Sequence, residues 1–155
     1  MEGTIQLMQL SDVKNVLKIE EESFSTSWTF NAFIYELLVN EKATYYTFKI
    51  EEQIIGYIGY WLLDDDIHIT NLAVAPLFRK KGIASKLINF IIRKAKDIGV
   101  SQISLEVRIT NQEAIKLYEK IGFARGKLLK EYYKREDGIE MVLLLKGGSN
   151  EEKQF

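Results

Sequence analysis

The stretch "NLAVAPLFRKKGIASKL", residues 71–87, combines an apolar run, a cluster of positive charge and the start of a helix. Its apolar first half is typical of a strand that ends near Pro76. Apolar residues then recur at helical spacing from Ile83 through Leu87 to Ile91, and Gly99 is suited to end that helix. The stretch therefore predicts a strand, a short basic loop and a helix, in that order.

The loop in this junction is suited to bind an anion. A helix N-terminus carries unpaired N–H groups and a partial positive charge. Gly82 lets the backbone approach a ligand closely, Ala84 keeps the next inward position small, and Ser85 adds a hydroxyl. The Walker A and G-x-G-x-x-G phosphate motifs do not occur in the chain. At this point, an ordinary solvated basic turn is an equally good interpretation.

Helix and strand patterns alternate on both sides of this junction. Helical spacing predicts helices, and runs of β-branched and aromatic residues predict strands. The expected strands span residues 4–10, 43–50, 53–63, 67–76 and 101–108, with two more within 123–145 around the turn "KREDG". One helix is expected to begin after a Ser11 cap. Three more are expected within residues 27–40, 82–99 and 111–122. We predict one α/β or α+β domain over residues 1–146 and a disordered tail over 147–155.

Composition excludes several classes of function. The formal net charge of −1 argues against a general nucleic-acid-binding protein. The chain has no cysteine and a single histidine, His68, so it offers no thiolate nucleophile, no histidine triad and no multi-histidine metal site. No apolar run approaches the roughly 20 residues of a membrane span. We expect a cytoplasmic protein without a metal ion or a direct contact with membrane or nucleic acid.

The pattern Arg79-x-x-Gly82-x-Ala84 after an apolar strand resembles the signature loop of the GNAT acetyltransferases. The resemblance runs from Thr4 to Leu145 and is nearest to the bacterial RimI-like branch, the ribosomal-protein alanine N-acetyltransferases. The segments "SFSTSWTFNAFIYEL", "NLAVAPLFRKKGIASKLI" and "LEVRITNQEAIKLYEKIGF" carry it. The resemblance implies a twisted mixed sheet of about seven strands with about four helices, in which two central strands splay apart.

The same resemblance implies two catalytic residues. The Glu of "LEVR", Glu106, is similar to the general base of RimI-like enzymes, and the Tyr of "KLYE", Tyr118, to the general acid. Glu106 shares one strand face with Ser104, opposite Leu105 and Val107. Taken singly, Glu106 reads as a surface charge and Tyr118 as a packed core residue. His68 is a possible second base, although a lone histidine in a strand is more often structural.

The resemblance also implies the binding residues. Backbone groups of the strand before the loop would hold the pantetheine of acetyl-CoA, and the loop with the helix start would hold the pyrophosphate. Asn111 would contact the cofactor or simply cap its helix. Trp28, Phe30, Tyr132 and Tyr133 would border the substrate, with packing as the alternative role. The cofactor set comprises Leu72, Ala73, Val74, Arg79, Lys80, Lys81, Gly82, Ile83, Ala84, Ser85 and Asn111.

Three hypotheses for function remain open at the level of sequence. The first is transfer of an acetyl group from acetyl-CoA to the N-terminal α-amino group of a ribosomal protein. The second is a GNAT enzyme that acts on lysine or a small amine, and the third is a non-catalytic acetyl-CoA-binding domain. Relatives often carry a Glu-Asp pair before the last strand, where this chain has only Glu140. The oligomeric state is left open.

Overall fold

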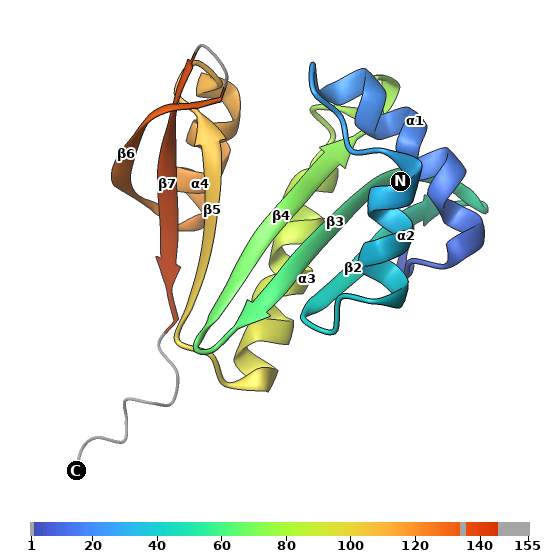
Figure 1. The fold of residues 1–155 in the computed structure, drawn as a ribbon, viewed down its shortest axis with the longest axis horizontal. Coiled ribbons are helices and arrows are strands. Elements are labelled where there is room, and N and C mark those ends of the chain that lie inside the picture. The colour runs from blue at the N-terminus through green and yellow to red at the C-terminus, as the bar shows by residue number, and fades with distance from the viewer. Residues whose placement is uncertain (1, 134–135, 146–155) are drawn as a thin grey trace. The chain divides into compact units, whose positions relative to one another are not determined.

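The computed structural model describes residues 2–133 and 136–145. Over this part of the chain, seven strands and four α-helices alternate as the sequence predicts (Figure 1). The strands are β1 (Thr4–Leu7), β2 (Ala43–Ile50), β3 (Gln53–Leu63), β4 (Asp66–Val74), β5 (Gln102–Arg108), β6 (Ala124–Tyr133) and β7 (Glu136–Leu144). The α-helices are α1 (Val13–Ser23), α2 (Phe30–Leu38), α3 (Ile83–Ile98) and α4 (Gln112–Ile121), with short 3-10 turns at Leu10–Asp12 and Pro76–Phe78.

The strands form one mixed sheet in the order β1-β2-β3-β4-β5-β7-β6. The pairs β1–β2, β2–β3, β5–β7 and β6–β7 are antiparallel, and β4 pairs with β5 in parallel. The β4–β5 register joins Asp66 to Gln102, Ile67 to Ile103 and His68 to Ser104. The predicted fold class, a mixed sheet of about seven strands with about four helices, is confirmed.

The chain divides into two compact units. The first contains Met1–Trp61 and Ile69–Phe90. Its core joins α1 and α2 to β2, β3 and β4 through buried side chains that include Val16, Phe33, Tyr45, Tyr57 and Ala73. On α3, Ile83 and Leu87 are buried and lie beside Gly56 of β3, where an added Cβ would meet both side chains at 3.5 Å.

The second unit contains Leu62–His68 and Ile91–Phe155. Alternate residues of β5, namely Ile103, Leu105 and Val107, are buried, as a strand with one apolar face requires. Ile115 of α4 and Met141 of β7 are fully buried as well. This packing fixes which face of β5 presents Ser104 and Glu106, and it confirms the alternation predicted from sequence.

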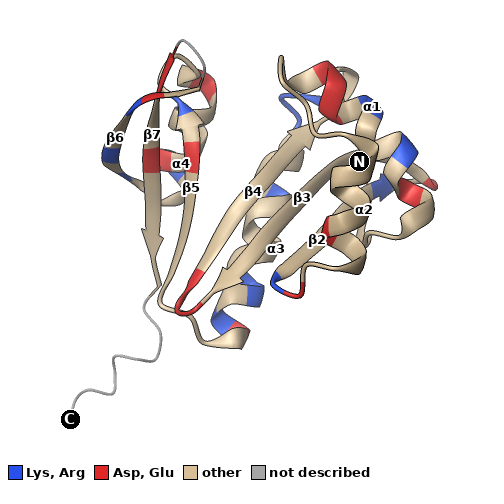
Figure 2. Cartoon of the chain, viewed as in Figure 1, with Lys and Arg blue, Asp and Glu red and all other residues tan. Residues whose placement is uncertain are grey.

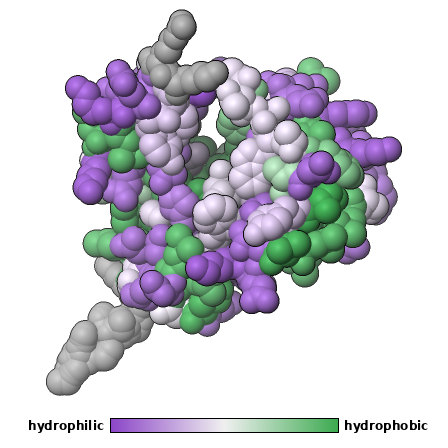
Figure 3. All heavy atoms as spheres, in the orientation of Figure 1, coloured by the Kyte–Doolittle hydropathy of each residue, from purple (hydrophilic) through white to green (hydrophobic). Residues whose placement is uncertain are grey.

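Three details of the fold differ from the sequence predictions. Ser11 does not cap α1, because it lies in the 3-10 turn, and the Asp12 carboxylate accepts the backbone N–H of Gln9 at 2.8 Å instead. Helical spacing predicts Phe30 and Leu38 on the apolar face of the helix expected within residues 27–40, but in α2 they are 42% and 63% exposed. Figure 3 shows apolar surface gathered over α2 on the face in view. The expected turn "KREDG" is not observed, because Glu136, Asp137 and Gly138 belong to β7 and residues 134–135 lie outside the described residues.

Two further expectations concern regions the structure leaves open. The expected tail, residues 147–155, lies outside the described residues, and a single domain over 1–146 stays a prediction. Among the described helices, none is both long and apolar enough to cross a membrane.

Candidate active site

The predicted anion loop joins β4 to α3 within the first unit. Gly82 has φ of +82°, a left-handed conformation that side-chain-bearing residues rarely adopt. A Cβ placed at Gly82 would meet no atom within 4 Å, so the space beside this backbone is open among the described residues. Helix α3 begins immediately after it, and the Lys86 N–H donates to the Gly82 carbonyl at 3.1 Å. The loop therefore presents the first N–H groups of α3 beside an open space.

Arg79 braces this loop. Its Nε donates to the Val74 carbonyl at 2.8 Å, and its Nη2 donates to the Ser23 hydroxyl at 2.9 Å. The guanidinium thus joins the end of β4 to the end of α1. Lys80 has φ of +61° and, like Lys81, is exposed. Contact between these cations and a cofactor stays a prediction.

The remaining predicted cofactor residues of this unit lie where the sequence places them. Strand β4 ends with Leu72, Ala73 and Val74, just before the loop. Ala73 and Val74 are buried. Ile83 is buried, with 3% of the residue exposed, and its contact with a cofactor stays a prediction. Ala84 and Ser85 are half-buried at the start of α3.

The predicted base lies on the polar face of β5, within the second unit. The side chain of Glu106 is 23% exposed, and its Oε1 lies 3.0 Å from His68 Nε2. Glu106 is also the direct cross-strand partner of Glu140 on β7. Figure 2 shows acidic residues on both of the neighbouring strands β5 and β7. The predicted face is therefore an acidic surface with one histidine bound to it.

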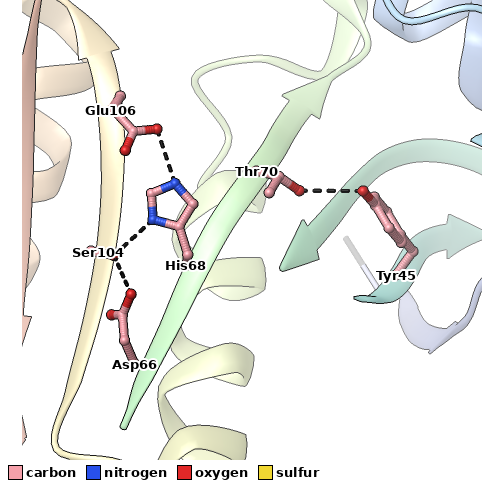
Figure 4. A network of polar contacts seen from close by, with 6 residues as sticks. All are labelled: Tyr45, Asp66, His68, Thr70, Ser104 and Glu106. Atoms are coloured by element: carbon pink, nitrogen blue, oxygen red, sulfur yellow. Dashed lines mark hydrogen bonds and ion pairs between the residues drawn. The ribbon is translucent and has the colours of Figure 1, made fainter. Parts of the chain in front are cut away.

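His68 belongs to a chain of polar contacts across β4 and β5 (Figure 4). His68 Nδ1 lies 2.8 Å from the Ser104 hydroxyl, and that hydroxyl donates to Asp66 Oδ2 at 2.8 Å. The parallel register brings His68 beside Ser104, which explains why the two side chains meet. The order of contacts along this network is Asp66, Ser104, His68 and Glu106.

The charges around His68 favour its protonated form. The hydrogen bond that His68 donates to Glu106 raises the pKa of His68, burial opposes that rise, and the charges of Glu106, Asp66 and Glu140 add to it. The resulting pKa lies above the ordinary value for histidine. His68 is therefore a cation over a wider pH range than a solvent-exposed histidine.

Tyr118, the predicted acid, lies in α4 with its ring 5.8 Å from that of Phe123. Burial raises the pKa of Tyr118 to about 12. Because the phenol holds its proton throughout the neutral range, it can donate that proton to an anion formed during a reaction. The carbonyl of Tyr118 also accepts the N–H groups of Gly122 and Phe123 at 3.0 and 2.9 Å, which fixes the end of its helix.

Tyr132 and Tyr133 stand at the end of β6. Their rings make an edge contact at 4.9 Å, and the Arg108 guanidinium lies 4.5 Å from the centre of the Tyr133 ring. Both tyrosines lie against Gly138, where an added Cβ would come within 2.8 Å of Tyr133 and 3.3 Å of Tyr132. Gly138 was not identified from sequence, although a glycine inside a strand is a known sign of close approach.

Electrostatics link these tyrosines to the predicted catalytic pair. Burial and then the charge of Glu106 raise the pKa values of Tyr132 and Tyr133. Tyr118 adds to the rise at Tyr133. These contributions place Glu106, Tyr118, Tyr132 and Tyr133 in one electrostatic neighbourhood of the second unit, and their roles in a site stay predictions.

Sequence reasoning missed most of the groups that hold this neighbourhood in place. Glu136 pairs with Arg108 at 3.2 Å and accepts the Thr110 N–H at 3.1 Å. The hydrogen bond from the Thr110 hydroxyl, followed by weaker contributions from the backbone and Arg108, lowers the pKa of Glu136 despite some opposing burial. The alternation within β4 and β5 indicates that Asp66 and Ser104 lie on the polar faces of their strands. Only the parallel register of the two strands shows that the two side chains meet.

Two other predicted residues, Asn111 and Trp28, have a structural role, and a third, Phe30, is exposed. The side chain of Asn111 accepts the Ala114 N–H at 3.2 Å, so it caps α4, as one of its two expected roles required. The half-buried Trp28 packs against the core with its ring 5.2 Å from that of Phe33. Phe30 starts α2 and is largely exposed. Contacts of these residues with cofactor or substrate stay predictions.

Comparison with known proteins gives a consistent result. The sequence profile of the Acetyltransferase (GNAT) family matches residues 10–123. The chain is 35% identical over 142 residues to the putative ribosomal protein bS18-alanine N-acetyltransferase of Bacillus subtilis (strain 168), a match that covers 92% of this chain and 93% of that protein. It is 31% identical over 153 residues to an N-alpha-acetyltransferase of Sulfolobus acidocaldarius, covering 90% of this chain and 89% of that protein.

A solved structure agrees in fold. The crystal structure of the ribosomal-protein-S18-alanine N-acetyltransferase from Escherichia coli matches with a TM-score of 0.85 at 26% identity, covering 92% of this chain and 94% of that one. The profile match spans more than half of the chain, and the matched relatives are similar over nearly their full length. The chain therefore belongs to the acetyltransferase (GNAT) family, and the prediction made from its signature loop is confirmed.

Proposed function

We propose that this acetyltransferase acts on the N-terminal α-amino group of a ribosomal protein, with Glu106 as the general base and Tyr118 as the general acid. The structural observation that carries the proposal is the partly exposed Glu106 carboxylate, bound by His68 at 3.0 Å, on the polar face of β5. A carboxylate in this position can accept a proton and yet remain ordered.

The names of the relatives support the choice of acceptor. The Bacillus subtilis and Escherichia coli proteins are named for the alanine of ribosomal protein bS18 or S18, and the archaeal relative is named for N-alpha acetylation. All three names refer to an N-terminal amine. An acceptor of that kind is also chemically easier, because an α-amino group has a pKa near 7.7–8.0 whereas that of lysine is near 10.4.

The loop before α3 is suited to hold the cofactor that GNAT enzymes share. Gly82 leaves open space beside its backbone, and the N-terminus of α3 can donate N–H groups to the pyrophosphate of acetyl-CoA. Lys80 and Lys81 are exposed next to it and would add positive charge. Acetyl-CoA supplies the acetyl group as a thioester.

The two catalytic residues have complementary proton states. Glu106 accepts the proton that the substrate amine loses as the new C–N bond forms. Tyr118 keeps its own proton at neutral pH because its pKa is raised to about 12, and it donates that proton to the departing thiolate. The exposed Tyr132 and the half-buried Tyr133 lie in the same electrostatic neighbourhood and would contact the peptide beside the amine.

Mass spectrometry of a peptide panel tests this proposal. The panel compares free N-termini that begin with Ala, Ser or Met with acetyl-blocked peptides that offer only an internal lysine, together with polyamines. We expect acetyl-CoA-dependent modification of the free N-terminus, strongest for Ala. Modification confined to lysine or polyamines would overturn the choice of acceptor and favour a GNAT enzyme of different specificity. Binding of acetyl-CoA without any transfer would indicate a non-catalytic domain.

A further inference from the structure

We propose that Asp66 and Ser104 are positioning residues for Glu106, because together they hold His68 protonated and give it a fixed orientation beside the base. The inference rests on the proposed role of Glu106 and extends it to two residues that the sequence did not predict as part of the site. It follows from the number of hydrogens that the network of Asp66, Ser104, His68 and Glu106 requires.

The network has three contacts and a carboxylate at each end. Asp66 and Glu106 can only accept hydrogen bonds when they are ionised. Between them, the Ser104 hydroxyl supplies one hydrogen and the His68 ring supplies one or two. The three contacts measure 2.8, 2.8 and 3.0 Å, so each is short enough to be a hydrogen bond.

Only the protonated ring satisfies all three contacts. Ser104 spends its single hydrogen on Asp66, so the contact at His68 Nδ1 needs a hydrogen from the ring. Glu106 accepts at Nε2, so that contact needs a second ring hydrogen. A neutral imidazole has one N–H and would leave one nitrogen lone pair facing an oxygen lone pair. The geometry therefore favours an imidazolium.

The charged groups near His68 also favour a ring with two N–H hydrogens. Asp66 of β4, Glu106 of β5 and Glu140 of β7 are the charged groups that influence the ring, and all three are acids. The His68 side chain is 18% exposed and Ser104 is 4% exposed, so water replaces these contacts only in part. The combined field of the acids raises the pKa of His68, with the hydrogen bond that the ring donates to Glu106 as the largest cause.

The far end of the network is itself held in place. Asp66 Oδ1 accepts from Gln102 Nε2 at 3.2 Å while Oδ2 accepts from Ser104. Each carboxylate oxygen thus has a donor, which fixes the orientation that Ser104 needs. Asp66 also follows the exposed residues Asp64 and Asp65, so this end of the network lies near solvent.

The orientation of the hydrogens allows a proton to move along the network from Glu106 toward Asp66 and solvent. When Glu106 accepts a proton from the amine, the His68 Nδ1–H bond can break as an O–H bond forms on Ser104. In the same concerted step the original Ser104 O–H bond breaks as one forms on Asp66, and Asp66 then releases its proton to water. One proton enters at Glu106 and one leaves at Asp66, and His68 keeps the Nε2–H that binds Glu106. The total charge of the network is unchanged.

Nitrogen NMR of the single histidine tests the proposal without any measurement of activity. His68 is the only histidine of the chain, so untagged protein labelled with 15N-histidine gives an unambiguous ring signal. We expect both ring nitrogens to be protonated at pH 7 in the unsubstituted chain. In Asp66→Asn and in Ser104→Ala, the pKa of His68 should fall by about one pH unit, as expected when an opposite charge or its hydrogen-bonded link is lost.

Asp64→Asn is the matched control, because it removes the same charge from the exposed turn two residues away. Circular dichroism confirms that each variant is folded, and Asp66→Asn decides the matter alone if Ser104→Ala does not fold. A neutral His68 ring at pH 7 in the unsubstituted chain would overturn the proposal. So would a fall of the pKa in Asp66→Asn no larger than that in Asp64→Asn.

Kinetics separate this inference from the proposed function. With an acceptor peptide, Asp66→Asn should lower kcat several-fold below pH 8 while leaving the KM for acetyl-CoA within about twofold, since a positioning residue acts through the base. If Glu106→Gln retains full activity, the proposed base is wrong even where the NMR result holds. If Glu106→Gln is inactive and Asp66→Asn has the unsubstituted pH profile, the base stands and the positioning role of Asp66 and Ser104 is overturned.

Discussion

Glu36 and Glu106 both bind aromatic side chains, and they differ in almost every other respect. Glu36 in the first unit is 6% exposed and accepts from the Tyr45 hydroxyl at 2.9 Å, from Trp61 Nε1 at 2.6 Å and from Asn40 Nδ2 at 3.0 Å. Glu106 in the second unit is 23% exposed at its side chain and has His68 at 3.0 Å. The first glutamate is surrounded by donors, whereas the second faces solvent in part.

The difference distinguishes a carboxylate that stabilises the fold, Glu36, from one proposed to take part in the reaction, Glu106. The partners of Glu36 do not change their proton state near neutral pH, and burial raises the pKa of Tyr45 further above its ordinary value. The partner of Glu106 is a histidine, which titrates near neutrality. We therefore expect substitutions at Glu36 to lower stability and substitutions at Glu106 to lower the rate of reaction.

The largest effect is expected for Glu106→Gln. Removal of a general base costs about 100-fold to 10,000-fold in rate, so kcat should fall by about 1,000-fold. The amide can still accept a hydrogen bond from His68, so the folded structure should persist. Steady-state kinetics with an N-terminal alanine peptide, together with urea unfolding, check both expectations. A kcat near that of the unsubstituted enzyme would remove the distinction between the two glutamates.

Glu36→Ala should have the opposite profile. It leaves the Tyr45 hydroxyl and the Trp61 N–H buried without their acceptor, and each such loss costs about 1–3 kcal/mol. We expect the free energy of unfolding to fall by about 3 kcal/mol. The exposed substitution Glu41→Ala is the control and should change stability little. Unfolding in urea measures both variants, and equal stability of the two would contradict the structural role.

Tyr118→Phe tests the acid of the second unit. The substitution keeps the ring that packs against Phe123 and removes only the phenolic proton. Because a thiolate is a good leaving group, we expect a loss near the lower end for acid catalysis, about 100-fold in kcat. The dissociation constant of acetyl-CoA, measured by calorimetry, should change little. A loss of cofactor affinity with kcat retained would assign Tyr118 to binding instead.

Gly82→Ala tests the proposed cofactor loop of the first unit. A Cβ meets no crowding there, but φ of +82° strains a side-chain-bearing residue by about 1 kcal/mol. Acetyl-CoA at about 100 times its dissociation constant should stabilise the unsubstituted protein by about 2.7 kcal/mol. The stabilisation by acetyl-CoA should be smaller in Gly82→Ala at the same acetyl-CoA concentration. A melting temperature that acetyl-CoA leaves unmoved in the unsubstituted protein would contradict cofactor binding.

The smallest effect concerns stability as a function of pH. The pKa of His68 is raised in the folded state, chiefly by Glu106, above an ordinary value near 6.5. Its contribution is therefore fully present below about pH 6.5 and is lost as pH rises through the raised pKa. The urea midpoint of the unsubstituted protein should fall toward that of His68→Gln over this window. A difference that grows with pH would contradict the sign.

Local patterns in the sequence predicted the elements well because each element has its own periodicity and its own end signals. Gly99 ends α3 and Gly122 ends α4 with positive φ, and Asn111 caps α4. The Ser11 cap was wrong because Asp12, one residue on, supplies the carboxylate that accepts the Gln9 N–H. Sequence alone did not show that a 3-10 turn precedes α1 and takes up both Ser11 and the Asp12 carboxylate.

The candidate site was only partly predictable for a different reason. Glu106 and Tyr118 were found through a family resemblance, but their surroundings depend on which strands are neighbours. His68 meets Ser104 only because β4 and β5 are parallel and in this register. Register is a property of the folded sheet and has no signal in either strand taken alone. Cytoplasmic location and the absence of a metal ion stay predictions.

One measurement tests the central claim most directly. A single peptide with an N-terminal alanine and one internal lysine is incubated with acetyl-CoA and either the unsubstituted enzyme or Glu106→Gln, and fragment-ion mass spectrometry locates the acetyl group. We predict acetylation of the alanine α-amino group by the unsubstituted enzyme and almost none by Glu106→Gln. Acetylation of the lysine alone, or equal product from both enzymes, would contradict the account.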